Sequence, residues 1–202
     1  MTDKGALMII SGPSGSGKGT VLKALFPNDK YALSVSVTTR QKRPGEIEGA
    51  DYFFRTQDEF REMVKNDELL EHAMFVGNFY GTPRSYVIDK VNEGKIVFLE
   101  IEVNGALQVK DKYPEAVLVF LMPPTMRGLK NRLLKRNTED LGTIEDRLQR
   151  ASEEIKLIYK YDYLVINDDV HKAADKINTI VKAERMKPER SSYKINYFKG
   201  EI

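Results

Sequence analysis

The chain has 202 residues, of which 41% are apolar and 31% charged, a composition that supports one folded domain with room for insertions. It contains no Cys and only two His, which excludes disulfides, cysteine-ligated metals and thiol catalysis and argues against a multi-histidine metal site. Lys and Arg number 32 against 30 Asp and Glu, a near balance that argues against a protein that mainly coats nucleic acid. The first residues do not resemble a signal peptide and no apolar run reaches about 20 residues, so we expect a cytoplasmic protein with no membrane or nucleic-acid partner.

Short apolar runs alternate with helical patterns along most of the chain. Strands are predicted at residues 7–10, 31–37, 52–54, 69–76, 96–99, 117–121 and 163–166, and helices at 20–26, 56–65, 82–94, 104–112, 125–136, 144–159 and 170–184. Thr56 with Glu59 predicts a capping box, residues 77–81 predict a turn, and Thr82 with Pro83 predicts an N-cap and a first helical residue. Fully apolar strands that alternate with helices predict a parallel sheet covered on both faces.

Residues 36–87 fit this alternation poorly, because they combine short strands, one helix and a charged loop. We expect a single domain over 1–202, with a core from 5–35, 88–124 and 160–186 and a small α+β subdomain inserted at 36–87. The stretch 187–202 mixes Lys, Arg, Tyr and Phe, which would suit RNA contact, but a frayed or surface-docked tail is the preferred interpretation.

Residues 12–18, called the phosphate loop below, match the pattern G-x-x-x-x-G-K between a predicted buried strand and a helix. Glycines let successive backbone N–H groups face one anion, and Lys18 adds a full positive charge beside the helix N-terminus. A chance Gly/Ser turn is the alternative, and the order strand, loop, helix argues against it. Gly19 stands where this pattern has a Ser or Thr that contacts Mg²⁺, and Thr20 follows, so we expect the metal to be held through water and assign no residue as its direct ligand.

Acidic and basic side chains follow in places where they could serve phosphoryl transfer. Glu100 ends an apolar strand and Glu102 comes two residues later, as groups that hold Mg²⁺ and its waters would, although both could be surface glutamates. Two groups of arginines, at positions 40 and 43 and at positions 132, 136 and 147, could converge on a chain of phosphates. No base-reading Asn-Lys-x-Asp segment of the switch NTPases is present. These features favour transfer of a phosphoryl group between two nucleotides over simple hydrolysis.

Together these motifs resemble the guanylate kinase family over residues 7–184. The likeness is carried by residues 12–18, 34–40, 43, 45, 46, 49, 51–52, 71, 77–82, 99–102, 132–136, 147–148 and 167–169. The chain departs from the commoner family pattern at Glu100 and Glu102, which replace aspartates, and at Gly19, which replaces a serine.

The resemblance implies a P-loop NTPase-type doubly wound α/β parallel sheet, with a GMP-binding insertion at 36–87 and a helical lid at 125–159. It implies transfer of the ATP γ-phosphate to GMP and, we expect, to dGMP, with ATP as co-substrate and Mg²⁺ as cofactor. The implied catalytic residues are Lys18, Arg43, Arg132, Arg136 and Arg147. The implied ATP site contains Gly12, Pro13, Ser14, Gly15, Ser16, Gly17, Lys18, Gly19, Thr20, Asn167 and Asp168, with Asn167 facing the adenine. The implied GMP site contains Ser36, Arg40, Arg43, Tyr52, Glu71, Tyr80, Thr82, Glu100 and Glu102.

The implied base readers are Glu71 and Thr82. Guanine presents two adjacent N–H donors that one carboxylate can accept, and its carbonyl oxygen can accept from the Thr82 hydroxyl, whereas adenine would leave Glu71 facing a lone pair. Two alternatives stay open: a catalytically inactive guanylate-kinase-like module that binds proteins, and a kinase directed at adenylate or pyrimidine nucleotides.

Overall fold

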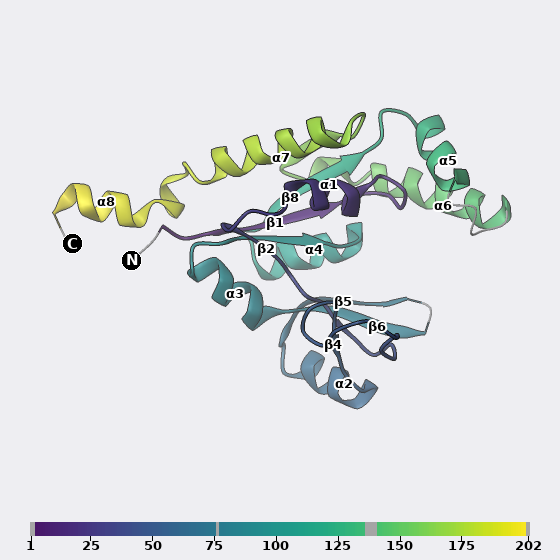
Figure 1. The fold of residues 1–202 in the computed structure, drawn as a ribbon, viewed down its shortest axis with the longest axis horizontal. Helices are drawn as coiled ribbons and strands as arrows, with labels where there is room; N and C mark the ends of the chain where they lie inside the picture. Colours follow the sequence, from purple (N-terminus) through teal and green to yellow (C-terminus); the bar gives the residue numbers. More distant parts are fainter. Residues whose placement is uncertain (1–2, 76, 136–140, 201–202) are drawn as a thin grey trace.

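The computed structural model describes residues 3–75, 77–135 and 141–200 (Figure 1). The strands are β1 Ala6–Ser11, β2 Tyr31–Leu33, β3 Val37–Thr38, β4 Phe53–Phe54, β5 Leu69–Phe75, β6 Asn78–Pro83, β7 Ile96–Glu100, β8 Val117–Met122 and β9 Tyr163–Ile166. The helices are α1 Lys18–Leu25, α2 Gln57–Lys65, α3 Arg84–Asn92, α4 Val103–Lys112, α5 Met126–Lys135, α6 Leu141–Ile155, α7 Val170–Glu184 and α8 Ser192–Lys199, with short 3-10 helices η1 Ile158–Lys160 and η2 Pro188–Arg190. Within the described ranges, no helix combines the length and the apolar character that a bilayer crossing requires.

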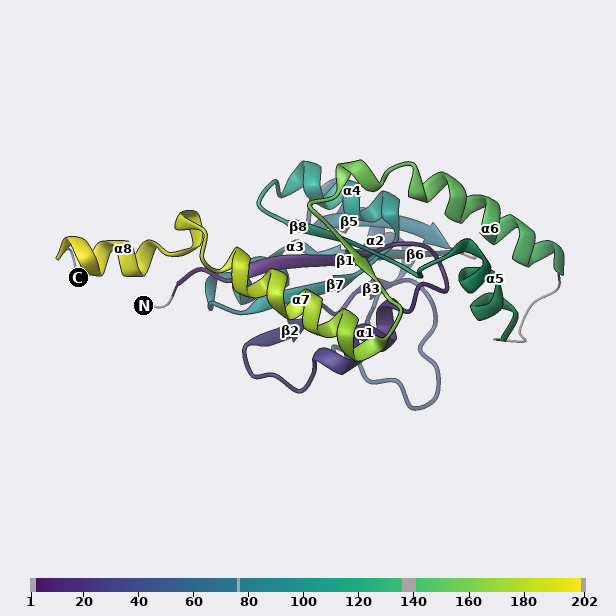
Figure 2. The ribbon, with the colours of Figure 1, turned by 90° about the horizontal axis from the view of Figure 1, so that it is seen from above.

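Five strands form a parallel sheet in the order β2-β7-β1-β8-β9, which confirms the predicted α/β architecture. All six residues of β1 are buried, and their side chains alternate between the two faces. Met8 and Ile10 pack with α1 and α7, whereas Leu7 and Ile9 pack with α3 and α4. Helices therefore cover both faces of the sheet, with α7 on one side and α3 and α4 on the other (Figures 1 and 2).

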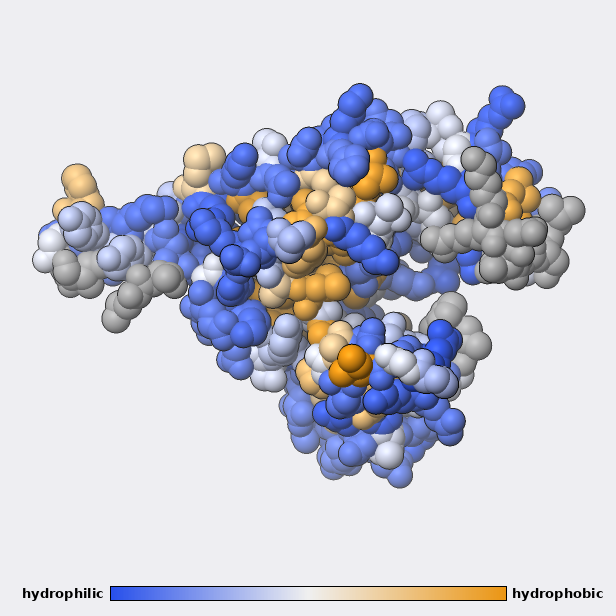
Figure 3. Space-filling model, in the orientation of Figure 1, coloured by the Kyte–Doolittle hydropathy of each residue, from blue (hydrophilic) through white to orange (hydrophobic). Residues whose placement is uncertain are grey.

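A second sheet, in the order β4-β3-β6-β5, lies beside the first and carries α2. Its small core contains Val37, Phe60 and Leu69. The predicted capping box starts α2: the Thr56 hydroxyl accepts from the Glu59 N–H at 3.2 Å, and Glu59 Oε2 accepts from the Thr56 N–H at 2.6 Å. In the space-filling view a notch separates the surface of this second sheet and α2 from the larger body of the molecule (Figure 3).

The predicted strand at 31–37 is wrong as a single element. The Ser34 N–H still donates to Phe98 of the large sheet, but the Ser36 carbonyl accepts from Phe53 of the small one. The chain changes sheets between these two residues, and alternating hydrophobicity on both sides of the change hides it from a sequence pattern.

The N-cap predicted at Thr82 is also wrong. Thr82 and Pro83 are the last residues of β6, and α3 begins at Arg84 with Pro83 as a cap that makes no side-chain hydrogen bond. The Thr82 hydroxyl is used elsewhere, because it donates to Glu71. The turn predicted at 77–81 is shorter than expected, since Asn78 already belongs to β6.

The helix boundaries shift by a few residues from those predicted. Helix α1 begins at Lys18 instead of Thr20, and α6 ends at Ile155, after which Ile158–Lys160 forms a 3-10 turn. Residues 136–140, between α5 and α6, lie outside the described ranges.

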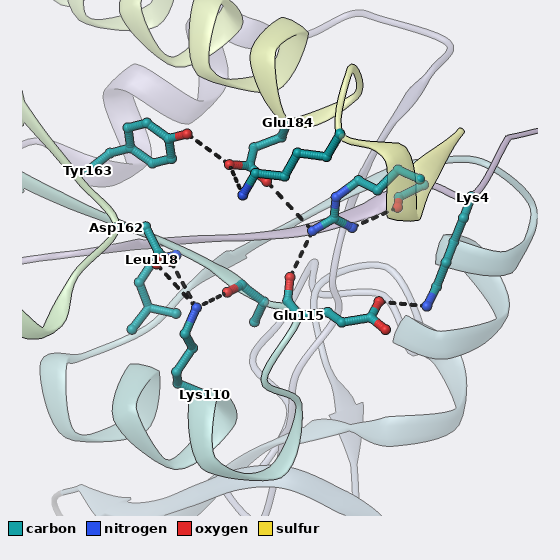
Figure 4. A network of polar contacts seen from close by, with 11 residues as sticks. Lys4, Lys110, Glu115, Leu118, Asp162, Tyr163 and Glu184 are labelled. Atoms are coloured by element: carbon teal, nitrogen blue, oxygen red, sulfur yellow. Dashed lines mark hydrogen bonds and ion pairs between the residues drawn. The ribbon is translucent and has the colours of Figure 1, made fainter. Parts of the chain in front are cut away.

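The C-terminal segment docks on the end of the large sheet opposite the phosphate loop and then leaves the body as α8 (Figures 1 and 4). The Arg190 side chain is 5% exposed and donates to the carbonyls of Gly5 at 3.1 Å and Glu115 at 2.8 Å. Buried Glu184 lies 3.7 Å from the Arg190 guanidinium and accepts from the Tyr163 hydroxyl at 2.8 Å, which raises the pKa of Tyr163 to about 12. Arg190 thus ties the start of the first strand to the end of the chain.

Candidate active site

The phosphate loop has the backbone that its glycines allow. Gly12, Gly15 and Gly17 have φ values of 140°, 85° and 93°, which L side chains rarely adopt. A β-carbon at Gly12 would also lie 2.1 Å from the Leu121 carbonyl oxygen. The loop can therefore take this course only with glycine at that position.

The side chain of Lys18 lies across the phosphate loop. Lys18 is the first residue of α1, and its Nζ donates to the carbonyls of Gly12 at 2.7 Å and Pro13 at 3.2 Å. The ammonium is thereby held next to the turn of the loop and the helix N-terminus, where an anion would gain from both.

The side chains of Asn167 and Arg132 stabilise the phosphate loop by hydrogen bonds to its backbone. The Asn167 amide donates to the Ser16 carbonyl at 2.8 Å, and Arg132 donates to the carbonyls of Ser16 at 3.1 Å and Asn167 at 2.7 Å. A β-carbon at Gly17 would lie 2.5 Å from the Asn167 amide nitrogen, so the glycine permits this close contact. Asn167 is 2% exposed, and its contact with adenine stays a prediction, as does the role of the exposed Asp168.

Helices α5 and α6 pack against each other through Leu129, Leu133, Ile144 and Ala151, and each brings one predicted arginine to the loop, Arg132 from α5 and Arg147 from α6. Arg147 on α6 lies 3.4 Å from the Ser14 hydroxyl. Arg136 lies outside the described residues.

In the loop that follows β3, Arg40 is held among aromatic rings and one carboxylate. It forms an ion pair with Glu46 at 2.6 Å and lies over the Tyr52 ring at 5.4 Å, and the Tyr52 and Tyr80 ring centroids are 6.1 Å apart. The same Glu46 accepts from the backbone N–H of Arg43 at 2.8 Å. The hydrogen bond from Arg40, helped by that from Arg43, lowers the pKa of the Glu46 carboxyl. Glu46 thus holds the predicted phosphate-binding arginines close together.

Glu71 and Thr82 face each other across the antiparallel strands β5 and β6. The Thr82 hydroxyl donates to Glu71 Oε1 at 2.7 Å, and Glu71 is 6% exposed. Burial raises the pKa of the Glu71 carboxyl, the hydrogen bond from Thr82 opposes this, and the charge of Glu102 adds to it. Thr82 has one hydroxyl proton, and here the hydroxyl donates its hydrogen bond to Glu71. The predicted donation to a guanine carbonyl would therefore require the hydroxyl to leave Glu71 and turn toward the base.

Three adjoining cavities connect these groups. The shared cavity, of about 430 Å³, is lined by Lys18 together with Ser36, Tyr52, Glu100, Glu102 and others. The loop cavity, of about 160 Å³, is lined by Gly12, Ser14, Lys18, Glu102, Arg147, Arg150 and Glu154. The carboxylate cavity, of about 380 Å³, is lined by Ser36, Tyr52, Glu71, Tyr80, Glu100, Glu102, Gly105, Arg150 and others. Residues of the phosphate loop and of the small sheet thus open onto common space.

Comparison with known proteins finds related sequences and a similar fold. The family model described as guanylate kinase matches residues 4–184. The guanylate kinase of Oceanobacillus iheyensis is 51% identical over 93% of this chain and 92% of its own, and that of Lactococcus lactis subsp. lactis is 51% identical over 94% and 93%. The chain belongs to the guanylate kinase family. A crystal structure of guanylate kinase from Anaplasma phagocytophilum has a similar fold, with a TM-score of 0.73 and 34% identity over 100% of this chain and 98% of its own.

Mg²⁺, which the guanylate kinase resemblance implies, fits the donor set at the C-terminal end of β7. The Glu100 carboxylate lies beside Gly19, where an added β-carbon would be 3.1 Å from Oε2. No hydrogen bond or ion pair engages that carboxylate among the residues with described positions. Those residues contain no group of three or more His, Asp or Glu that could cage a metal, and one carboxylate completed by phosphates and waters is the arrangement that Mg²⁺ commonly takes.

Three residues near the candidate site are not among those that the sequence predicts for it. Glu46 belongs to a family motif without a predicted role, although its spacing from Arg40 and Arg43 is compatible with a partner for both. Gly105 lies on α4, where an added β-carbon would be 3.0 Å from Glu71 Oε2. Arg150 on α6 pairs with Glu102, a contact between positions 48 apart that no local pattern reveals.

Proposed function

We propose that this chain transfers the γ-phosphoryl group of ATP to GMP or dGMP, with the phosphate loop as donor site and the small sheet as acceptor site. One observation carries the proposal: Lys18 of the phosphate loop and Ser36 and Tyr52 of the small sheet line the same cavity. Two nucleotides bound to these two walls would meet at their phosphate ends.

Positive charge from three directions supports this reaction. Lys18 and the N-terminus of α1 would hold the donor phosphates, and Arg147 would approach them from α6. Arg40 and Arg43 would hold the acceptor phosphate together with Ser36, Tyr52 and Tyr80. Arg132 would act indirectly: its hydrogen bonds to the carbonyls of Ser16 and Asn167 would keep the phosphate loop in place while charge develops on the transferring group.

Glu100, with Glu102 next to it, is the residue that would hold Mg²⁺ against the donor phosphates. The bound ion would neutralise charge on the phosphate oxygens. Gly19 offers no side chain to contact it, so the carboxylate takes the place of the missing hydroxyl.

Glu71 would select the base. As a carboxylate it would accept both adjacent donors of guanine, and its burial would make an unmatched base costly. The proposed exclusion of water by closure of 125–159 over the donor would favour transfer to GMP over hydrolysis. A cytoplasmic location and the lack of a nucleic-acid partner stay predictions from the sequence.

The test offers ATP and Mg²⁺ with GMP, dGMP, AMP, CMP or UMP in separate coupled assays for ADP. We expect ADP with GMP and with dGMP. ADP with none of the five would favour a protein-binding module, and a preference for AMP, CMP or UMP would overturn the assignment of the base site.

A further inference from the structure

Arg150 is a cationic side chain that lines both the cavity beside the phosphate loop and the cavity beside Glu71. Among the described residues that line them, it belongs to both the loop cavity and the carboxylate cavity, and it is the single cation of the latter. Arg150 has no role in the proposed phosphoryl transfer.

Arg150 holds two carboxylates that come from different parts of the chain. Its Nη2 donates to Glu102 Oε2 at 2.5 Å, and its Nε donates to Glu154 Oε1 at 3.3 Å. Glu154 lies on the same helix, whereas Glu102 follows β7 and is the N-cap residue of α4. One guanidinium fork thus joins α6 to the wall on which Glu71 and Gly105 lie.

The same helix also reaches the phosphate loop. Arg147 lies one turn before Arg150 and approaches the Ser14 hydroxyl at 3.4 Å. A displacement of α6 toward bound donor phosphates would therefore carry Arg150, and with it the side chain of Glu102. The negative charge of Glu102 in turn raises the pKa of the Glu71 carboxyl, so the position of Glu102 affects the carboxylate that would read the base.

We propose that Arg150 is a positioning residue that couples the two nucleotide sites: it fixes Glu102 on the acceptor wall when Arg147 engages the donor. This inference rests on the proposed function. Donor binding then tightens acceptor binding, and by thermodynamic reciprocity the acceptor tightens donor binding by the same factor.

The test measures GMP binding to the full chain by calorimetry, with Mg²⁺, in the absence and presence of a saturating ATP analogue whose β–γ bridge is an imido group. For the unmodified protein we expect the analogue to lower the Kd for GMP about fivefold or more, the lower end of common coupling between sites. In Arg150→Gln this factor should fall to within about twofold of unity, and at saturating ATP the KM for GMP should rise more than kcat changes. Arg150→Lys, which keeps the charge and loses the fork, should retain part of the coupling.

Lys156→Gln is the matched control, because Lys156 directly follows α6 and pairs with the exposed Glu153 at 2.8 Å outside these cavities. It should leave the coupling factor unchanged. Glu102→Gln combined with Arg150→Gln should lose no more coupling than Arg150→Gln alone, since both act through one contact.

Equal thermal midpoints of the variants would show that each is folded. Full coupling in Arg150→Gln, stronger coupling in it, or no coupling in the unmodified protein would each overturn the inference. Failure of the unmodified protein to phosphorylate GMP would instead overturn the proposed function, because coupling is read from binding alone.

Discussion

The carboxylate of Glu100 occupies the space over Gly19 that a side chain at position 19 would need. A β-carbon there would lie 3.1 Å from Glu100 Oε2 and 3.5 Å from Oε1. Two of the three positions at which the sequence departs from the commoner family pattern, Gly19 and Glu100, are therefore neighbours in space. We expect the longer acid and the absent hydroxymethyl group to compensate for each other.

This compensation predicts how the two departures behave when reversed. Gly19→Ser alone should crowd the Glu100 carboxylate and lower kcat/KM for MgATP by roughly tenfold, whereas Gly19→Ser with Glu100→Asp should recover most of the loss. The four proteins of this cycle are compared by steady-state kinetics over a Mg²⁺ series. Strictly additive losses would show that the two side chains act independently.

Glu71→Gln should weaken base selection. The amide replaces one acceptor by a donor, so the ratio of kcat/KM for GMP to that for AMP should fall by roughly a hundredfold or more. Parallel assays with both nucleotides measure this ratio. Glu62→Gln, an exposed carboxylate on α2, is the control. An unchanged ratio in Glu71→Gln would place base reading elsewhere.

The same substitution should make the protein more stable at neutral pH. Burial raises the pKa of Glu71 above its unfolded value, so its contribution to stability is complete below the ordinary Glu pKa and is lost as the pH rises through the raised value. Glutamine does not ionise, so Glu71→Gln removes this loss of stability at higher pH. Thermal unfolding of both proteins should show a higher midpoint for Glu71→Gln near neutral pH and no gain near about pH 4. A gain of the same size at both pH values would contradict the ionisation argument.

Gly105→Ala should impair GMP binding without touching the donor site. Its β-carbon would lie 3.0 Å from Glu71 Oε2 and would displace that carboxylate. We expect the KM for GMP to rise about tenfold, with the KM for ATP little changed. In a Glu71→Gln background the same alanine should cost less, because the group it displaces has already lost its role.

Lys18→Ala should lower kcat by a hundredfold or more, on the order of losses seen when one preorganised donor to a developing anion is removed. It removes the ammonium and also the hydrogen bonds to the Gly12 and Pro13 carbonyls that shape the loop. Lys23→Ala, at an exposed position of the same helix, controls for the lost charge. Comparable activity of Lys18→Ala and Lys23→Ala would remove Lys18 from the mechanism.

The sequence predicts what is local. The phosphate loop could be predicted because its glycines, Lys18 and the flanking strand and helix are consecutive, and the capping box could be predicted because it lies within four residues, Thr56 to Glu59. Contacts between distant positions could not, since nothing in the order of residues shows that Glu100 lies on Gly19 or that Arg150 reaches Glu102. Thr82 shows the same limit: its local signal as a cap is real, but a buried carboxylate on the neighbouring strand competes for its hydroxyl.

The strand that carries the phosphate loop is made before both of the strands that pair with it. β1 lies at the centre of the large sheet, yet its two partner strands begin only at Ile96 and Val117. A nascent chain that has not yet emerged as far as Met122 has no sheet on which to fix the loop and so cannot grip ATP. The phosphate loop is therefore synthesised well before the two strands that hold its own strand in place, and it can bind a nucleotide only after they have been made and have paired.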